Sequence, residues 1–277
     1  MSKRVLITGG NSGIGLRTAE QLAARGAEVI LACRDQTKGQ AAVARIKNLT
    51  PGARVRLFQL DLADLDQVRQ SANRILDKVD RVDVLINNAG VVPTRQQYTA
   101  DGFEMQFGVN YLAPVLLTHQ LLPALRAADS ARIVHVASVA HWLGRINPKT
   151  WRGRRPYLVM DAYGQSKLAN ILFSDELARR LANHGITSNA LHPGGVDTGI
   201  FRHVPKPAMA LIRPTLTTPE RAARLPVRMA LDSEFDGVSG GYFDAKGQTL
   251  RSPRARNQRM AQTLYQDTTA LLGLQPL

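Results

Sequence analysis

Short apolar runs alternate with longer amphipathic stretches along most of the chain. The first six runs contain no proline, and most lack alternating polar positions, which is typical of strands buried on both faces of a sheet. We expect strands at Arg4–Thr8, Glu28–Ala32, Val55–Leu60, Val82–Asn87, Ala131–Ala137, Thr187–His192 and Gly241–Phe243.

The intervening stretches have the periodicity of helices, and Asp64 and Thr218 stand where N-caps are favoured. Strands that alternate with helices predict an α/β fold, a Rossmann-type doubly wound sheet of about seven parallel strands with helices on both faces. We expect helices at Gly13–Arg25, Asp35–Asn48, Leu65–Lys78, Asp101–Ala127, Ala162–Asn183 and Pro219–Leu231.

Two long stretches have no regular pattern, His141–Met160 and Gly199–Thr217, the second of which contains Pro205, Pro207 and Pro214. Long irregular segments in a compact α/β protein usually serve function, so we expect both to border the substrate site and 199–217 to act as a lid. No internal repeat or compositional break divides the chain, and we expect one domain over residues 1–277.

The composition, 44% hydrophobic and 21% charged, is that of a globular protein and excludes a collagenous or mostly disordered chain. The net charge of +14 favours an anionic partner, which could be nucleic acid, a membrane surface or an acidic ligand. The single Cys33 excludes an internal disulfide, and no Cys/His spacing predicts a metal site. The first apolar run, Val5-Leu6-Ile7, is too short for a signal peptide or membrane anchor, so we expect a cytoplasmic protein.

A glycine-rich loop joins the first strand to the first helix. Glycines there let the backbone approach a pyrophosphate at the helix N-terminus, where unpaired N–H groups and the helix dipole favour anions. A plain glycine-rich turn is the alternative. The residues expected to bind a dinucleotide are Gly9, Asn11, Ser12, Gly13, Ile14 and Gly15.

The end of the second strand reads Ala32-Cys33-Arg34, at the place that usually contacts the adenosine ribose. An acidic residue that would bind a free 2′-hydroxyl is missing, whereas Arg34 can pair with a 2′-phosphate. We therefore expect NADP(H) to be preferred over NAD(H). A solvated surface arginine is the alternative.

Tyr163 and Lys167 stand at positions i and i+4 of an expected helix, so the ammonium can lower the pKa of the phenol and make it a general acid. Such a pair is common by itself. Its weight comes from Ser138, directly after the fifth strand, and from Asn110 in the preceding helix.

Taken together and in order, the motifs resemble the short-chain dehydrogenase/reductase family over nearly the whole chain. The matching pieces are Thr8 through Gly15, Asp61-Leu62, Asn87-Asn88-Ala89-Gly90, Asn110, Ser138, Tyr163 with Lys167, and Pro193-Gly194 followed by Thr198.

The resemblance implies a nicotinamide enzyme in which Tyr163 transfers the hydroxyl proton and Lys167 orients the ribose and tunes Tyr163. It implies that Ser138 holds the carbonyl oxygen and that Asn110 keeps a water in a proton relay. Further cofactor contacts implied are Asp61 and Leu62 at the adenine, Asn88, Ala89 and Gly90 at the ribose, and Pro193, Gly194, Val196 and Thr198, the last at the nicotinamide amide.

A narrower likeness is to the retinol dehydrogenase-like branch, whose wide spacing of serine and tyrosine is similar to that between Ser138 and Tyr163. Eukaryotic members usually carry an N-terminal membrane anchor, which is not expected here, so retinoid or sterol specificity is not carried over. Asn11 and Ser12 stand where some NADP-preferring members place a basic residue, so the preference depends on Arg34, with Arg17 as a weaker helper. The segments that carry the likeness are Leu31-Ala32-Cys33-Arg34-Asp35, Ser166-Lys167-Leu168-Ala169-Asn170, His192-Pro193-Gly194 and Ser252-Pro253-Arg254-Ala255-Arg256-Asn257.

Basic residues cluster between His141 and Met160, where no acidic residue is found. With the nearby aromatic residues they could bind nucleic acid, an acidic or aromatic substrate, or only solvent; we favour a solvated face and expect no nucleic-acid partner. Four of the six histidines, His119, His141, His184 and His203, show no ligand spacing and are expected to serve packing or lie on the surface. The basic residues are Arg145, Lys149, Arg152, Arg154 and Arg155.

The sequence thus predicts an NADP(H)-dependent oxidoreductase that transfers hydride between nicotinamide and a small-molecule carbonyl/alcohol pair, a lipophilic ketone, aldehyde or alcohol. The alternative is a non-catalytic NADP-binding regulatory or scaffold protein, against which the presence of Asn110, Ser138, Tyr163 and Lys167 argues. A homodimer and a homotetramer are both compatible with the sequence.

Overall fold

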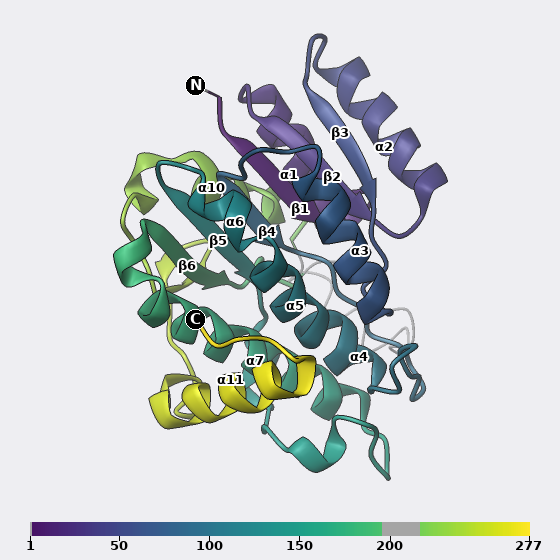
Figure 1. Ribbon diagram of the computed structural model, residues 1–277, viewed down its shortest axis with the longest axis vertical. Coiled ribbons are helices and arrows are strands. Elements are labelled where there is room, and N and C mark those ends of the chain that lie inside the picture. The colour runs from purple at the N-terminus through teal and green to yellow at the C-terminus, as the bar shows by residue number, and fades with distance from the viewer. Residues whose placement is uncertain (1, 196–216) are drawn as a thin grey trace.

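Eight strands form one sheet in the part of the chain that the structure describes, residues 2–195 and 217–277 of a computed structural model (Figure 1). Their order across the sheet is β3-β2-β1-β4-β5-β6-β7-β8, so the chain crosses from one edge to the middle between β3 and β4. The bounds are β1 Arg4–Thr8, β2 Glu28–Cys33, β3 Val55–Gln59, β4 Val84–Asn87, β5 Ala131–Val136, β6 Ile186–Leu191, β7 Tyr242–Asp244 and β8 Gly247–Gln248.

The seven expected parallel strands are confirmed, with ends that shift by one or two residues. The expected count of seven was one too low, because β8 pairs antiparallel with β7 through Phe243 and Gln248. A strand of two residues is too short to show a hydrophobic pattern, and the antiparallel hairpin only widens one edge.

Successive residues of the central strands supply two separate cores, one on each face of the sheet. Leu6 belongs to the core with α3, α5 and α7, whereas its neighbours Val5 and Ile7 belong to the core with α1, α2 and α10. This burial on both faces explains why the strands read as unbroken apolar runs.

Helices cover both faces of the sheet, as expected for a doubly wound fold (Figure 1). The expected caps are confirmed: Asp64 accepts from the Gln67 N–H at 3.0 Å, and Thr218 from the Arg221 N–H at 3.3 Å. The bounds are α1 Gly13–Ala24, α2 Gln36–Leu49, α3 Leu65–Leu76, α4 Met105–Phe107, α5 Ala113–Gln120, α6 Leu122–Arg126, α7 Val159–Arg180, α9 Pro219–Ala222, α10 Arg224–Leu231 and α11 Gln258–Leu272.

The expected continuous helix Asp101–Ala127 was wrong. It begins at α4 and contains a π-helical turn, Gly108–Leu112, before α5. Proline has no N–H, so Pro114 cannot donate to the carbonyl of Asn110 four residues earlier, and the Ala113 N–H bonds the Gly108 carbonyl instead. The turn therefore occurs at Asn110, one of the expected site residues.

The sequence pattern missed α11, whose buried side is interrupted by Thr268 and Thr269 before Leu272. This helix packs along α7, with Tyr265 stacked on Phe173 (Figure 1). Within the expected irregular segment His141–Met160 the structure has one short 3-10 turn, Pro148–Thr150, the end of another, and the start of α7. The expected lid lies outside the described residues apart from Thr217.

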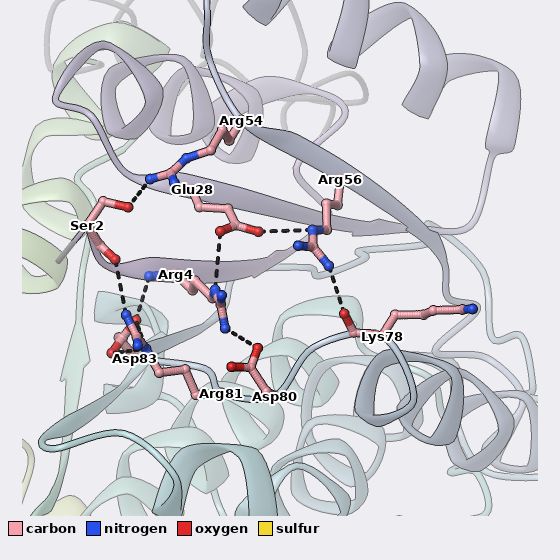
Figure 2. A network of polar contacts seen from close by, with 9 residues as sticks. All are labelled: Ser2, Arg4, Glu28, Arg54, Arg56, Lys78, Asp80, Arg81 and Asp83. Atoms are coloured by element: carbon pink, nitrogen blue, oxygen red, sulfur yellow. Dashed lines mark hydrogen bonds and ion pairs between the residues drawn. The ribbon is translucent and has the colours of Figure 1, made fainter.

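Ion pairs link the amino ends of the strands on the side opposite the glycine-rich loop (Figure 2). Glu28, whose side chain is 7% exposed, bonds the Arg4 guanidinium at 3.1 Å and the Arg56 guanidinium at 2.9 Å. Arg4 also pairs with Asp80, and its N–H donates to Asp83. Neighbouring strands are thus joined at their starts by charges that neutralise one another.

None of the helices in the described ranges is long and apolar enough to cross a membrane.

Candidate active site

The glycine-rich loop between β1 and α1 has a backbone that only glycine suits. Gly9 has φ +67° and Gly13 has φ +52°, and a Cβ on Gly15 would lie 2.3 Å from the Gly9 carbonyl oxygen. Ser12 is the N-cap of α1 but its side chain makes no capping bond, so it leaves the first N–H groups of the helix to other acceptors. Space is open beside Gly13, where a Cβ would meet no atom within 4 Å. The loop therefore fits a phosphate group.

Thr8 joins this loop to the end of β4. Its hydroxyl accepts from the backbone N–H of Asn88 and of Ala89, both at 3.0 Å. The Asn88 amide donates back to the Thr8 carbonyl at 2.8 Å, and Ala89 lies against Gly9. The two expected cofactor-binding segments thus form one surface at the carboxyl end of the sheet.

Arg34 follows β2 with an exposed side chain that forms no ion pair with any residue the structure describes. Asp35, in contrast, caps α2 by accepting from the Lys38 N–H at 3.0 Å and pairs with the Lys38 ammonium at 3.3 Å. These contacts engage both oxygens of its carboxylate. Cys33 is buried against Gly39, and burial raises the pKa of its thiol.

Asp61 and Leu62 follow β3, next to the end of β2. The Asp61 carboxylate accepts from the Ala63 N–H at 2.9 Å, and Leu62 is buried. Gln59 donates to the Arg34 carbonyl at 3.3 Å, so the ends of β2 and β3 are joined. The expected adenine contacts therefore lie beside the expected 2′-phosphate contact.

Two glycines bring Ser138 to Tyr163. A Cβ on Gly144 would lie 2.3 Å from the Gly164 carbonyl oxygen, and one on Gly164 would lie 2.8 Å from that of Ala140. This close contact places α7 against the 3-10 turn Val139–Trp142 (η2), of which Ser138 is the N-cap. The Ser138 hydroxyl lies close enough to the Tyr163 hydroxyl to lower the pKa of that phenol.

Lys167 lies one turn after Tyr163 on α7 with its ammonium 5.5 Å from the centre of the Tyr163 ring. The ammonium is buried and donates to the Val136 carbonyl at 2.8 Å. A Cβ on Gly90 would lie 3.6 Å from this ammonium and 3.4 Å from the Asn110 amide oxygen. Gly90 therefore lies in contact with both polar side chains.

Asn110 uses its side-chain amide to hold the loop after β4 and the start of α7 together. Its oxygen accepts from the Val91 N–H at 2.8 Å, and its nitrogen donates to the Val91 carbonyl at 3.1 Å and to Ser166 at 3.2 Å. Ser166 in turn donates to the Tyr163 carbonyl at 2.8 Å. All four expected catalytic residues thus lie in one connected cluster.

Burial dominates the protonation of this cluster. Burial raises the pKa of Tyr163, which the nearby Ser138 hydroxyl only partly offsets, and it lowers the pKa of Lys167 to about 8. The expected lowering of the Tyr163 pKa is not found in this arrangement, because burial of the phenol raises that pKa.

The expected contacts after β6 are described only in part. Pro193 and Gly194 are half-buried, and Gly194 has φ +93° with its α-carbon beside Thr217, whose N–H donates to Gly195 at 2.7 Å. Val196 and Thr198 lie outside the described residues.

The basic segment between β5 and α7 is partly bound to the protein itself. Arg152 lies 4.3 Å from the centre of the Phe103 ring and donates to the Asp101 carbonyl, and Arg154 donates to Thr150. Within residues 2–195 and 217–277, no cluster of His, Cys, Asp or Glu is arranged to hold a metal ion.

Sequence reasoning did not assign a role to Thr8, Ser166 or His141. Thr8 and Ser166 lie inside the recognised motifs. Their hydrogen bonds join segments that are distant in the sequence, Thr8 to Asn88 and Ser166 to Asn110, so the sequence alone did not indicate them. His141 stands three residues after Ser138, which is the spacing of one 3-10 turn, and that spacing was the available signal.

Comparison with known proteins identifies the class. The model of the short chain dehydrogenase family matches residues 3–208, and the chain belongs to this family. It is therefore an alcohol/carbonyl oxidoreductase with a nicotinamide cofactor.

Its relatives lie in the retinol dehydrogenase-like branch. The chain is 42% identical to retinol dehydrogenase 13 of Homo sapiens over 99% of this chain and 85% of the relative, and 42% identical to human retinol dehydrogenase 11 over 98% and 86%. A crystal structure of an uncharacterized protein from Mycobacterium paratuberculosis matches with a TM-score of 0.80 and 38% identity, over 99% of this chain and 95% of that one.

Proposed function

We propose that the protein is an NADP(H)-dependent oxidoreductase of lipophilic ketones, aldehydes or alcohols. The observation that carries this proposal is the cluster of Ser138, Tyr163 and Lys167, which lies at the carboxyl ends of the strands, as does the glycine-rich loop. A bound nicotinamide would supply or accept the hydride.

The chain's own residues would handle the oxygen and its proton. Tyr163 is the acid in reduction and the base in oxidation, since its hydroxyl lies near that of Ser138, which would hold the substrate oxygen beside it. Lys167 provides a buried positive charge beneath the ring, and Asn110 fixes the loop that ends at Gly90.

The cofactor would lie along the strand ends already described. The first N–H groups of α1 would bind the pyrophosphate, with Asp61 and Leu62 at the adenine and Asn88 to Gly90 at the ribose. The segment from Pro193 onward would border the nicotinamide. These assignments match the polar groups and open space beside Gly13.

A lipophilic substrate is favoured by the side chains next to Ser138. Val139, Trp142 and Leu143 are 56%, 45% and 57% exposed, although large apolar side chains are usually buried. Leu250, two residues before a contact with this turn, is also exposed. Apolar substrate surface could bury these side chains.

A preference for NADP(H) is supported by Arg34 and by Asp35. The Arg34 guanidinium is available for a 2′-phosphate, and the Asp35 carboxylate is held by α2. A short chain dehydrogenase from Shigella flexneri, with a TM-score of 0.70 and 26% identity over 88% of this chain and 97% of that one, was solved with NADP.

The test compares kcat/KM for NADPH and NADH with a panel of aliphatic and aromatic aldehydes. We expect Arg34→Ala to reduce the NADPH preference about 10- to 100-fold, because a charge-assisted bond is worth roughly 1.5–3 kcal/mol. Arg126→Ala is the matched control, since Arg126 is exposed at the end of α6, at the opposite end of the sheet. Equal use of both cofactors by the parent would contradict the NADP proposal, and cofactor binding without turnover would favour a scaffold.

A further inference from the structure

His141 lies inside the turn that carries Ser138. The turn begins at Ser138, whose backbone is extended with φ −163° and ψ 155° and whose hydroxyl accepts from the Ala140 N–H at 3.2 Å. The Ser138 carbonyl accepts twice from one residue, from the His141 N–H at 3.1 Å and from His141 Nδ1 at 2.8 Å. The imidazole thus holds the main chain of Ser138 directly.

The two backbone partners of the ring determine where its proton lies. A carbonyl can only accept, so Nδ1 must carry the hydrogen that faces Ser138. Nε2 receives the N–H of Ser252 at 3.1 Å, and an N–H can only donate, so Nε2 must be unprotonated. Burial and the nearby Arg251 lower the pKa of His141, in agreement with a neutral ring.

The segment that supplies this second partner is firmly attached. Ser252 is 2% exposed, and its hydroxyl accepts from the Ala255 N–H at 3.2 Å. Arg251 pairs with Asp175 of α7 at 2.6 and 2.7 Å, and Arg254 donates to the Gly144 carbonyl at 3.4 Å. The segment Arg251–Arg254 is therefore held in place where it contacts Nε2 of the His141 ring.

The groups around His141 also restrict it from the sides. Tyr242 of β7 meets the ring edge-on at 5.2 Å between centres, and Trp142 lies 5.6 Å away. His192, after β6, is near enough for its charge to matter. The ring is thus enclosed by β7, the end of β6 and the C-terminal segment.

We propose that His141 is a positioning residue for catalysis: its Nδ1–H holds the Ser138 carbonyl, and its Nε2 ties that turn to the Ser252 amide. The proposal rests on the proposed function of Ser138. Reaction rates depend steeply on the placement of such groups, since a shift of about 1 Å can cost about 100-fold.

Two substitutions separate the two nitrogens. The amide of His141→Asn reaches the place of Nδ1 and can still donate to Ser138, whereas the amide of His141→Gln reaches the place of Nε2 and leaves the Ser138 carbonyl without its second donor. We expect kcat to fall about 10- to 100-fold in His141→Gln and to stay within about fivefold in His141→Asn, with the Kd for NADPH unchanged. His184→Gln, at an exposed histidine, is the control and should leave kcat unchanged.

A double-mutant cycle shows whether His141 acts through Ser138. In a Ser138→Ala background we expect His141→Gln to lower kcat by less than about threefold, because the hydroxyl to be positioned is gone. A loss equal to that in the parent, or equal losses in the Asn and Gln variants, would overturn the proposal. If Ser138→Ala is as active as the parent, the proposed function of Ser138 itself fails, which is a distinct result.

A measurement on the unaltered protein covers the case in which His141→Gln does not fold. Nitrogen-15 NMR of labelled histidines at pH 7.5, assigned with His141→Asn, distinguishes the tautomers. We expect the neutral Nδ1–H form for His141; an Nε2–H ring or an imidazolium would overturn the proposal.

Discussion

The two ends of the sheet treat polar groups in opposite ways. At the amino end, charged side chains neutralise one another: Glu28 bonds both Arg4 and Arg56, and Arg4 also meets Asp80 (Figure 2). At the carboxyl end, Lys167 is buried beside a carbonyl and forms no ion pair with the described residues. Polar groups satisfied within the protein stabilise the fold, whereas those left without a matching charge indicate where a ligand binds.

The buried charges at the two ends affect the stability of the folded state in different ways. Desolvation favours the neutral form of Lys167, so the charged form that catalysis would use at neutral pH destabilises the folded state. Glu28 is buried to a similar degree but has two cationic partners, which offset its desolvation. Substitutions at the two ends should therefore separate activity from stability.

The largest effect is expected for Tyr163→Phe at the carboxyl end. The ring can still pack, but the hydroxyl that would transfer the proton is gone, so we expect turnover to fall about 10²- to 10⁴-fold while NADPH binding is retained. Steady-state kinetics and cofactor fluorescence measure the two quantities. Tyr98→Phe is the control, because Tyr98 is exposed and its hydroxyl accepts a hydrogen bond from Gln96. A Tyr163→Phe rate within a few-fold of the parent would remove Tyr163 from the mechanism.

The next effect is expected for Glu28→Gln at the amino end. The substitution keeps the shape but removes the charge shared by Arg4 and Arg56, and we expect the free energy of unfolding to fall by about 2 kcal/mol with kcat unchanged. Urea denaturation measures the loss. Glu234→Gln removes an exposed pair with Arg228 and should cost less than about 1 kcal/mol. Equal losses in the two variants would mean that burial adds nothing to the network.

The smallest effect on stability is expected for Lys167→Met, which should make the protein more stable at pH 7 although turnover also falls. The lowered pKa of Lys167, about 8 against 10.5, means that the buried charge destabilises the parent by about 3 kcal/mol at pH 7. The variant removes this penalty but leaves the Val136 carbonyl unpaired, which costs about 2 kcal/mol. The net gain in the free energy of unfolding is therefore about 1 kcal/mol.

The stability difference between Lys167→Met and the parent should depend on pH. Because the unfolded chain binds the Lys167 proton more tightly than the folded protein, the parent gains stability relative to the variant as pH rises from about 8 to 10.5. The advantage of Lys167→Met should thus be largest below pH 8, disappear near about pH 9 and reverse at higher pH, because the unpaired Val136 carbonyl still costs about 2 kcal/mol. Urea denaturation at pH 7 and pH 10, with Lys149→Met as the exposed control, measures it. A variant less stable than the parent at pH 7 would show that Lys167 is stabilised by its surroundings.

The sequence predicted those features that depend on local pattern. Seven strands could be predicted because each is an apolar run, and the positions of Ser138 and Asn88 follow because parallel strands place their carboxyl ends at one edge. Two features depend on contacts between distant residues: the π-helical turn at Asn110 and the bond from Ser252 to His141. No periodicity reports such contacts.

Local pattern also failed where polar residues are buried. Thr268 and Thr269 of α11 bond backbone carbonyls within their own helix, and so they can occupy core positions that a hydrophobic pattern counts as exposed. The predicted direction of the Tyr163 pKa shift differs from the structure for a related reason, because the burial of this side chain cannot be read from the residue types around it.

Cys33, buried behind Arg34 against Gly39, bears on the chemical durability of the protein. Only the thiolate attacks electrophiles and peroxides, and burial raises the pKa of this thiol, so at neutral pH the sulfur stays protonated and unreactive. It is the sole cysteine of the chain. An aldehyde that enters the site therefore meets no competing sulfur nucleophile from this chain, and oxidative damage to cysteine should require the protein to unfold first.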